Sequence, residues 1–199
     1  MVKVYSVVAL TTLWMVWCTV GADPPECRGR PHRNGSTTDC CNVNLSPEQV
    51  ECARKIKEKW MEKRNSSDKE NVDMSDVGCT SDCIFTTDIV TSDNEIITEE
   101  VKPALDKILE GPEWQSLSPT MIETCKNRAV QGSGGRKGHA GHCNMVKEKF
   151  LFCINEQIIE HCPDSLWKND EECNKARTYL KNCPYEKRFG GKRGQQEEQ

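Results

Sequence analysis

Large apolar side chains are scarce in this chain. Aromatic residues make up 6% of its 199 residues, whereas charged residues make up 29%. A core built from so few aromatic side chains is thin for this length. Disulfides worth roughly 2–4 kcal/mol each can offset that weakness, so the composition favours a cross-linked fold.

Long apolar runs are missing after the N-terminus. The run Val4–Val16 follows Lys3, and the small residues Gly21 and Ala22 come a few positions after it, an order typical of a secretory signal peptide. It is shorter than the roughly 20 residues of a membrane span. We predict a signal peptide at 1–22 and a secreted, extracellular protein without a membrane span.

An excess of positive charge is lacking, and so are catalytic motifs. The net charge of −4 becomes −4 − 1 = −5 once Lys3 is removed, whereas nucleic acid requires a basic face. Cys40–Cys41 is not followed by the His-Asp pair of a secreted phospholipase. Gly132–Gly138 lacks the strand and the GK[ST] ending of a phosphate-binding loop. We expect no nucleic-acid partner, no enzyme activity and no cofactor.

Cysteine is the residue that the sequence has in quantity. Removal of Cys18 with the signal peptide leaves 13 − 1 = 12 cysteines, an even number suited to six disulfides in an oxidising compartment. His139, His142 and Cys143 have side chains that bind zinc, but a secreted cysteine favours a disulfide, so we expect no metal. The twelve are Cys27, Cys40, Cys41, Cys52, Cys79, Cys83, Cys125, Cys143, Cys153, Cys162, Cys173 and Cys183.

Helical signals fill the mature chain, and neither an alternating strand pattern nor a hairpin signal is found. Ser46, Pro47 and Gln49 predict a helix start, with the helix reaching about Arg64. Other helices are expected around 79–85, from Thr98 to Gly111, from Ser118–Pro119 through Ala129, over 143–163 and over 170–182. The fold class is therefore all-α, with six to seven short helices. We divide the chain into the signal peptide, an irregular arm at 23–45, a helical domain with a cysteine-rich extension at 46–186, and a disordered tail at 187–199.

The segment 143–163 carries a buried helical stripe that includes Phe150 and Ile154. Along a helix, Cys153 and Cys162 are about 13.5 Å apart and on opposite faces. A disulfide spans at most about 7 Å between Cα atoms, so these two cysteines cannot pair with each other. We expect the helix to be pinned to two separate neighbours.

The spacing of six of these cysteines resembles that of the insect odorant-binding proteins. Three residues separate Cys79 from Cys83, and eight separate Cys153 from Cys162. The additional cysteines and Pro163, directly after Cys162, resemble the extra-cysteine subgroup called Plus-C. The resemblance implies a helical shell around an apolar cavity, and transport of odorants, pheromones or similar small hydrophobic ligands in olfaction. It also implies an olfactory receptor or another binding protein as a partner, and a monomer or homodimer.

The resemblance further implies disulfide pairings. The family's scheme pairs Cys52 with Cys83 and Cys79 with Cys153. The partner of Cys162 stays open between Cys143 and Cys125, because an unbroken helix would separate Cys143 from Cys162 by about 28 Å.

The expected ligand-binding residues are apolar and recur at helical spacing. The same pattern describes ordinary core packing, since a cavity lining and a core have the same chemistry. The residues are Ile84, Phe85, Ile89, Ile97, Leu105, Ile108, Leu109, Trp114, Met121, Ile122, Phe150, Ile154 and Ile158. The alternative function is a disulfide-rich secreted interaction protein, such as an inhibitor or a salivary or reproductive-fluid factor.

Two glycosylation sequons, at Asn34 and Asn65, lie in segments expected to be exposed. Natively secreted protein should therefore lose mass on enzymatic deglycosylation. Asn34→Gln and Asn65→Gln, made separately, assign the loss to a site. An unchanged mass in secreted wild-type material would contradict the prediction.

Overall fold

The computed structural model describes residues 27, 39–65, 78–131 and 143–184. Within these ranges it contains six helices and, besides them, two isolated β-bridges, which confirms the all-α, disulfide-rich class. No helix in the described ranges is both long and apolar enough to cross a bilayer. The segments predicted as signal peptide and tail lie outside the described residues, as does Asn34, whereas Asn65 is exposed at the end of a helix. The helices are α2 (Pro47–Asn65), α3 (Thr80–Ile84), α4 (Thr98–Ile108), α5 (Pro112–Gln131), α6 (Met145–His161) and α7 (Glu171–Asn182).

Polar caps start three of these helices. At α2 the Ser46 N–H donates to Gln49 Oε1 at 2.9 Å, and the Gln49 N–H donates to Ser46 Oγ at 3.2 Å, which is the capping box expected from the sequence. Asn144 Oδ1 accepts from the backbone N–H groups of Val146 and Lys147 at the start of α6. At α7, Asp170 accepts from the Cys173 N–H at 2.8 Å, and this bond lowers the pKa of the Asp170 carboxyl.

The predicted start of α5 at Ser118–Pro119 is wrong. The helix begins at Pro112, which takes the first helical position after Gly111, and Pro119 lies inside it. Gly111 has φ of +115°, a conformation that glycine adopts without strain. An interior proline costs a hydrogen bond, but the buried face of α5 continues across it from Trp114 to Ile122. Burial of that face therefore outweighs the local penalty.

A short hairpin-like turn between α3 and α4 was also missed. Val90 and Ile96 form an isolated antiparallel bridge, and the Ile97 N–H donates to Ile89 O at 2.9 Å. Asn94 turns the chain with φ of +64°, a conformation that asparagine tolerates better than most residues. The turn signal was present in Thr91–Asn94, but the flanking strands are too short to show alternation.

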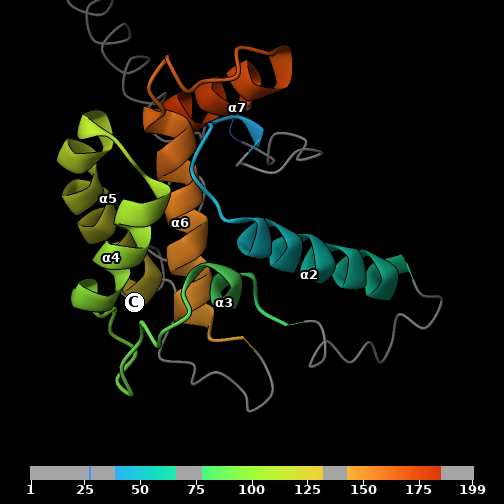
Figure 1. The fold of residues 1–199 in the computed structure, drawn as a ribbon, viewed down its shortest axis with the longest axis vertical. Helices are drawn as coiled ribbons and strands as arrows, with labels where there is room; N and C mark the ends of the chain where they lie inside the picture. The colour runs from blue at the N-terminus through green and yellow to red at the C-terminus, as the bar shows by residue number, and fades with distance from the viewer. Residues whose placement is uncertain (1–26, 28–38, 66–77, 132–142, 185–199) are drawn as a thin grey trace, which may run out of the picture. The chain divides into compact units, whose positions relative to one another are not determined.

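The chain forms two compact units, residues 35–173 and a second one made of 1–34 with 174–199. In the first unit, α6 lies between α5 and α4 on one side and α3 and α2 on the other (Figure 1). Contacts join α5 to α6, α4 to α5, α3 to α6 and α2 to α3. In the second unit, Cys27 is joined to Cys183, and the Tyr179 hydroxyl donates to Cys27 O at 3.4 Å.

An extended segment before α2 is bonded to the ends of two helices. The Asn42 N–H donates to Leu166 O, just after α6, and the Lys168 N–H donates to Cys40 O. Two residues further on, the Asn44 N–H donates to Ile108 O at 2.9 Å, at the end of α4. This segment therefore links the end of α4 to the chain that follows α6.

All twelve predicted cysteines are in disulfides. The Cα–Cα separations run from 5.3 to 5.9 Å, within the usual range. As expected, Cys153 and Cys162 bind different neighbours. The pairs are Cys27–Cys183, Cys40–Cys173, Cys41–Cys162, Cys52–Cys83, Cys79–Cys143 and Cys125–Cys153.

Cys52–Cys83 is confirmed, whereas the pairing of Cys79 with Cys153 is wrong. The Ser81 N–H, two residues after Cys79, donates to Glu148 Oε1 at 2.9 Å, so α3 meets the beginning of α6. Cys153 lies five residues, about 7.5 Å, further along that helix. Cys79 therefore pairs with Cys143, and Cys153 pairs with Cys125 of α5.

Both partners considered for Cys162 are also wrong. Cys162 ends α6 and pairs with Cys41, in the segment that runs beside Leu166 and Trp167. Cys143 and Cys125 are already taken by Cys79 and Cys153. The six-cysteine scheme did not include Cys41, which is the partner of Cys162.

The α5–α6 disulfide should stabilise the protein more than the α2–α3 disulfide. The two close loops of similar length, with separations of 28 and 31 residues, so their loop-entropy effects are alike. Cys125 and Cys153 are also part of the buried cluster, whereas Cys52 is only partly buried. Cys125→Ala/Cys153→Ala should lower the free energy of unfolding by about 2–4 kcal/mol, and by more than Cys52→Ala/Cys83→Ala, in urea denaturation. Recovery of a Cys79–Cys153 peptide from a non-reducing digest would contradict the assigned pairing.

Candidate functional site

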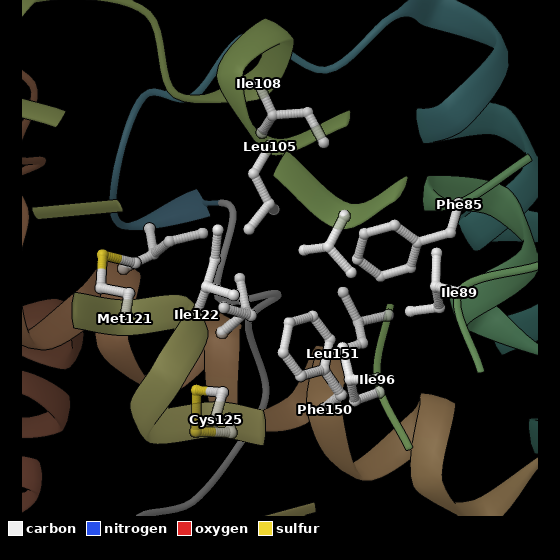
Figure 2. Close-up of a cluster of buried hydrophobic side chains, with 14 of the residues drawn as sticks. Phe85, Ile89, Ile96, Leu105, Ile108, Met121, Ile122, Cys125, Phe150 and Leu151 are labelled. Atoms are coloured by element: carbon white, nitrogen blue, oxygen red, sulfur yellow. A yellow bond between two sulfur atoms is a disulfide. The ribbon is translucent and has the colours of Figure 1, made fainter. Parts of the chain in front are cut away.

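One apolar cluster fills the space between α4, α5, α6 and the segment that follows α3. Side chains from all four point toward a common centre, with Leu105 and Ile108 from α4, Ile122 from α5 and Phe150 from α6 (Figure 2). These side chains are at most 5% exposed. The Cys125–Cys153 disulfide joins α5 to α6 within the cluster, and both of its cysteines are cluster members.

Two phenylalanines meet inside the cluster. The ring centroids of Phe85 and Phe150 are 6.0 Å apart, and the rings are tilted by 52°. That arrangement is a favourable one for aromatic pairs and adds about 0.5–1.5 kcal/mol to the effect of burial. The pair joins the chain after α3 to the first half of α6.

Polar contacts between α3 and α6 hold Phe85 in this position. The Lys147 side chain, 10% exposed, places its ammonium group 2.7 Å from Asp82 Oδ1 and donates to Phe85 O at 3.3 Å. The neighbouring Glu148 accepts from the Ser81 N–H. A buried ammonium requires such partners, and here they lie directly beside the backbone of Phe85.

The structure places most of the predicted ligand-binding residues together. All except Ile84 and Ile97 are members of the buried cluster, and Ile84 packs against it while partly exposed. Ile97 is only partly buried and caps α4, and its neighbour Ile96 is the buried residue. Because the 90–96 bridge was not foreseen, the inward residue was assigned one position too late. That any of these residues contacts a ligand stays a prediction.

Some members of the cluster were not among the ligand-binding residues predicted from the sequence. Val101 is fully buried and Leu151 is 6% exposed. Val101 is on the apolar face of α4 and had a visible helical signal. Leu151 follows Phe150 directly and lies outside the single stripe that periodicity predicted, because α6 is contacted on more than one side.

The sulfurs of Cys79 and Cys143 lie close to a Glu148 oxygen, with all three atoms within 4.8 Å of one another. Both cysteines are in one disulfide, so neither is a thiolate that could bind a metal. Cys143 therefore cannot serve as the sulfur ligand of the zinc site considered for His139, His142 and Cys143. The two histidines of that site, His139 and His142, lie outside the described residues.

Comparison with known proteins gives a distant similarity. The chain is 23% identical over 119 residues to "Odorant-binding protein 47" of Anopheles gambiae, a match that covers 54% of this chain and 52% of the mosquito protein. The chain therefore spans about half the length of this curated relative. No family model matches the chain. The similarity supports the resemblance to odorant-binding proteins in general, and membership of the Plus-C subgroup stays a prediction.

Phe150 should be a major contributor to stability. It is fully buried and packs against Phe85, so Phe150→Ala should lower the free energy of unfolding by about 3–5 kcal/mol in urea denaturation. Met145→Ala is the matched control, because Met145 is on the same helix and 50% exposed. The control should change stability by less than about 0.5 kcal/mol. Equal effects of the two substitutions would contradict the assigned packing.

Proposed function

We propose that the chain is a secreted, non-catalytic carrier that binds a small hydrophobic molecule within the apolar cluster of α4, α5 and α6. The similarity to a mosquito odorant-binding protein carries this proposal. The ligand is an odorant, a pheromone or a molecule of similar size and polarity. It enters between helices that separate slightly on binding, and it replaces some contacts among the cluster side chains.

The chemistry of the cluster supports this role. Its members are aliphatic or aromatic side chains and disulfide sulfurs, the kind of lining that holds a hydrophobic ligand. Two disulfides tie α6 to α5 and to the N-terminal segment. These bonds keep the helices in place when a ligand loosens the packing between them.

A fluorescent hydrophobic probe tests the proposal. N-phenylnaphthylamine should bind the oxidised protein at one equivalent and be displaced by odorant-sized molecules. Ile122→Trp should block uptake because the larger ring fills the centre of the cluster. Val130→Trp on the same helix is the matched control, since Val130 is 44% exposed, and it should bind as wild type does. Circular dichroism verifies that each variant is folded.

Two treatments separate a carrier from the alternatives. Reduction of the disulfides should abolish probe uptake together with cooperative unfolding, whereas EDTA at the same pH should alter neither. Wild-type protein that is folded and takes up no probe would contradict the carrier and favour the disulfide-rich interaction protein.

A further inference from the structure

Two buried hydroxyl groups have no hydrogen-bond partner in the described part of the chain. They are Ser81 Oγ and Ser118 Oγ, on residues that are 1% and 3% exposed. A buried hydroxyl without a partner destabilises the fold, because it has lost its hydrogen bonds to water and gained none in return. Native proteins leave few such groups, so each requires an explanation.

Ser118 lies on the face of α5 that packs into the apolar cluster. Trp114 is one turn before it and Ile122 one turn after it, and both are at most 2% exposed. Met121 and Cys125, on the same face, are also cluster members. The hydroxyl therefore lies on the helix face that carries these apolar side chains, and no described group is hydrogen-bonded to it.

Local alternatives for this hydroxyl are not used. Serine in a helix often donates to the carbonyl three or four residues earlier, here that of Gln115 or Trp114. Ser118 Oγ makes neither bond.

Other buried polar side chains have hydrogen-bond partners. Lys147 has Asp82 and the carbonyl of Phe85 as partners, and Gln157 donates to Glu160 at 3.3 Å. Ser81 lies in the polar contact between α3 and α6, where its backbone N–H is bonded to Glu148. Of the two unpartnered hydroxyls in the described ranges, that of Ser118 is the one with cluster members both one turn before and one turn after it on the same helix.

We propose that Ser118 Oγ is the polar anchor of the ligand site, and that the ligand is a hydrophobic molecule with a single hydroxyl or carbonyl oxygen. This inference rests on the proposed carrier function. A serine hydroxyl both donates and accepts, so it bonds a carbonyl oxygen as donor and an alcohol as either partner. A hydrocarbon has no group that can hydrogen-bond to the serine hydroxyl, so the hydroxyl does not raise the affinity for it.

Pairs of ligands that differ only at the oxygen test this assignment. Acetophenone is compared with α-methylstyrene, in which a methylene replaces the carbonyl oxygen, and octanol with nonane, in which a methyl replaces the hydroxyl. Affinities are measured by displacement of N-phenylnaphthylamine. Wild-type protein should prefer the oxygen-bearing member of each pair by about tenfold, beyond the difference in their water-to-hydrocarbon transfer.

Ser118→Ala should reduce this preference to about one. The substitution removes a hydroxyl without partners and leaves the side chain smaller, so the protein should fold. Ser81→Ala is the matched control: it removes the other unpartnered hydroxyl and should retain the tenfold preference.

The outcomes distinguish this inference from the function beneath it. If the wild type binds both members of each pair equally well, Ser118 is not the polar anchor, although the carrier function still holds. The same conclusion follows if the preference survives Ser118→Ala. Failure of folded wild type to bind the probe or any of the four molecules would overturn both proposals.

Discussion

The attachment of α6 on two faces is the constraint on which the first unit depends. Midway along the helix Cys153 is bonded to Cys125 of α5, and at its end Cys162 is bonded to Cys41. These bonds fix both the distance of α6 from α5 and the path of the N-terminal segment. That segment in turn bonds the end of α4 through the Asn44 N–H, so the three helices around the apolar cluster are tied together by covalent and backbone bonds.

This arrangement would suit the proposed carrier, whose interior would both stabilise the fold and take up a ligand. A core that only stabilises is best filled with closely interlocking side chains, and any ligand that enters it disturbs those contacts. Disulfides between members of the cluster hold the helices together independently of the noncovalent packing around them. In the proposed ligand site, the unpartnered hydroxyl of Ser118 belongs to the same compromise, because it destabilises the empty protein and would gain a partner only from a bound ligand.

Much of the local structure was readable from the sequence. The capping box at Ser46 and Gln49 and the helical stripe around Phe150 predicted α2 and α6, because caps and periodicity act within a few residues. The start of α5 was misplaced at Pro119, since the burial that overrides a proline comes from other helices. Ile96 was missed in favour of Ile97 because a single bridge pair leaves no alternation to read.

The sequence by itself determined the helical class, the even set of cysteines and the apolar character of the cluster. It also determined that Cys153 and Cys162 bind different neighbours, because a helix holds them too far apart. The identity of those neighbours was decided only by the tertiary structure. A disulfide requires Cα atoms within about 7 Å, and for residues far apart in the chain that distance depends on how whole helices pack. The isolation of the Ser118 hydroxyl has the same origin, since only the packed helices determine which polar groups come within its reach.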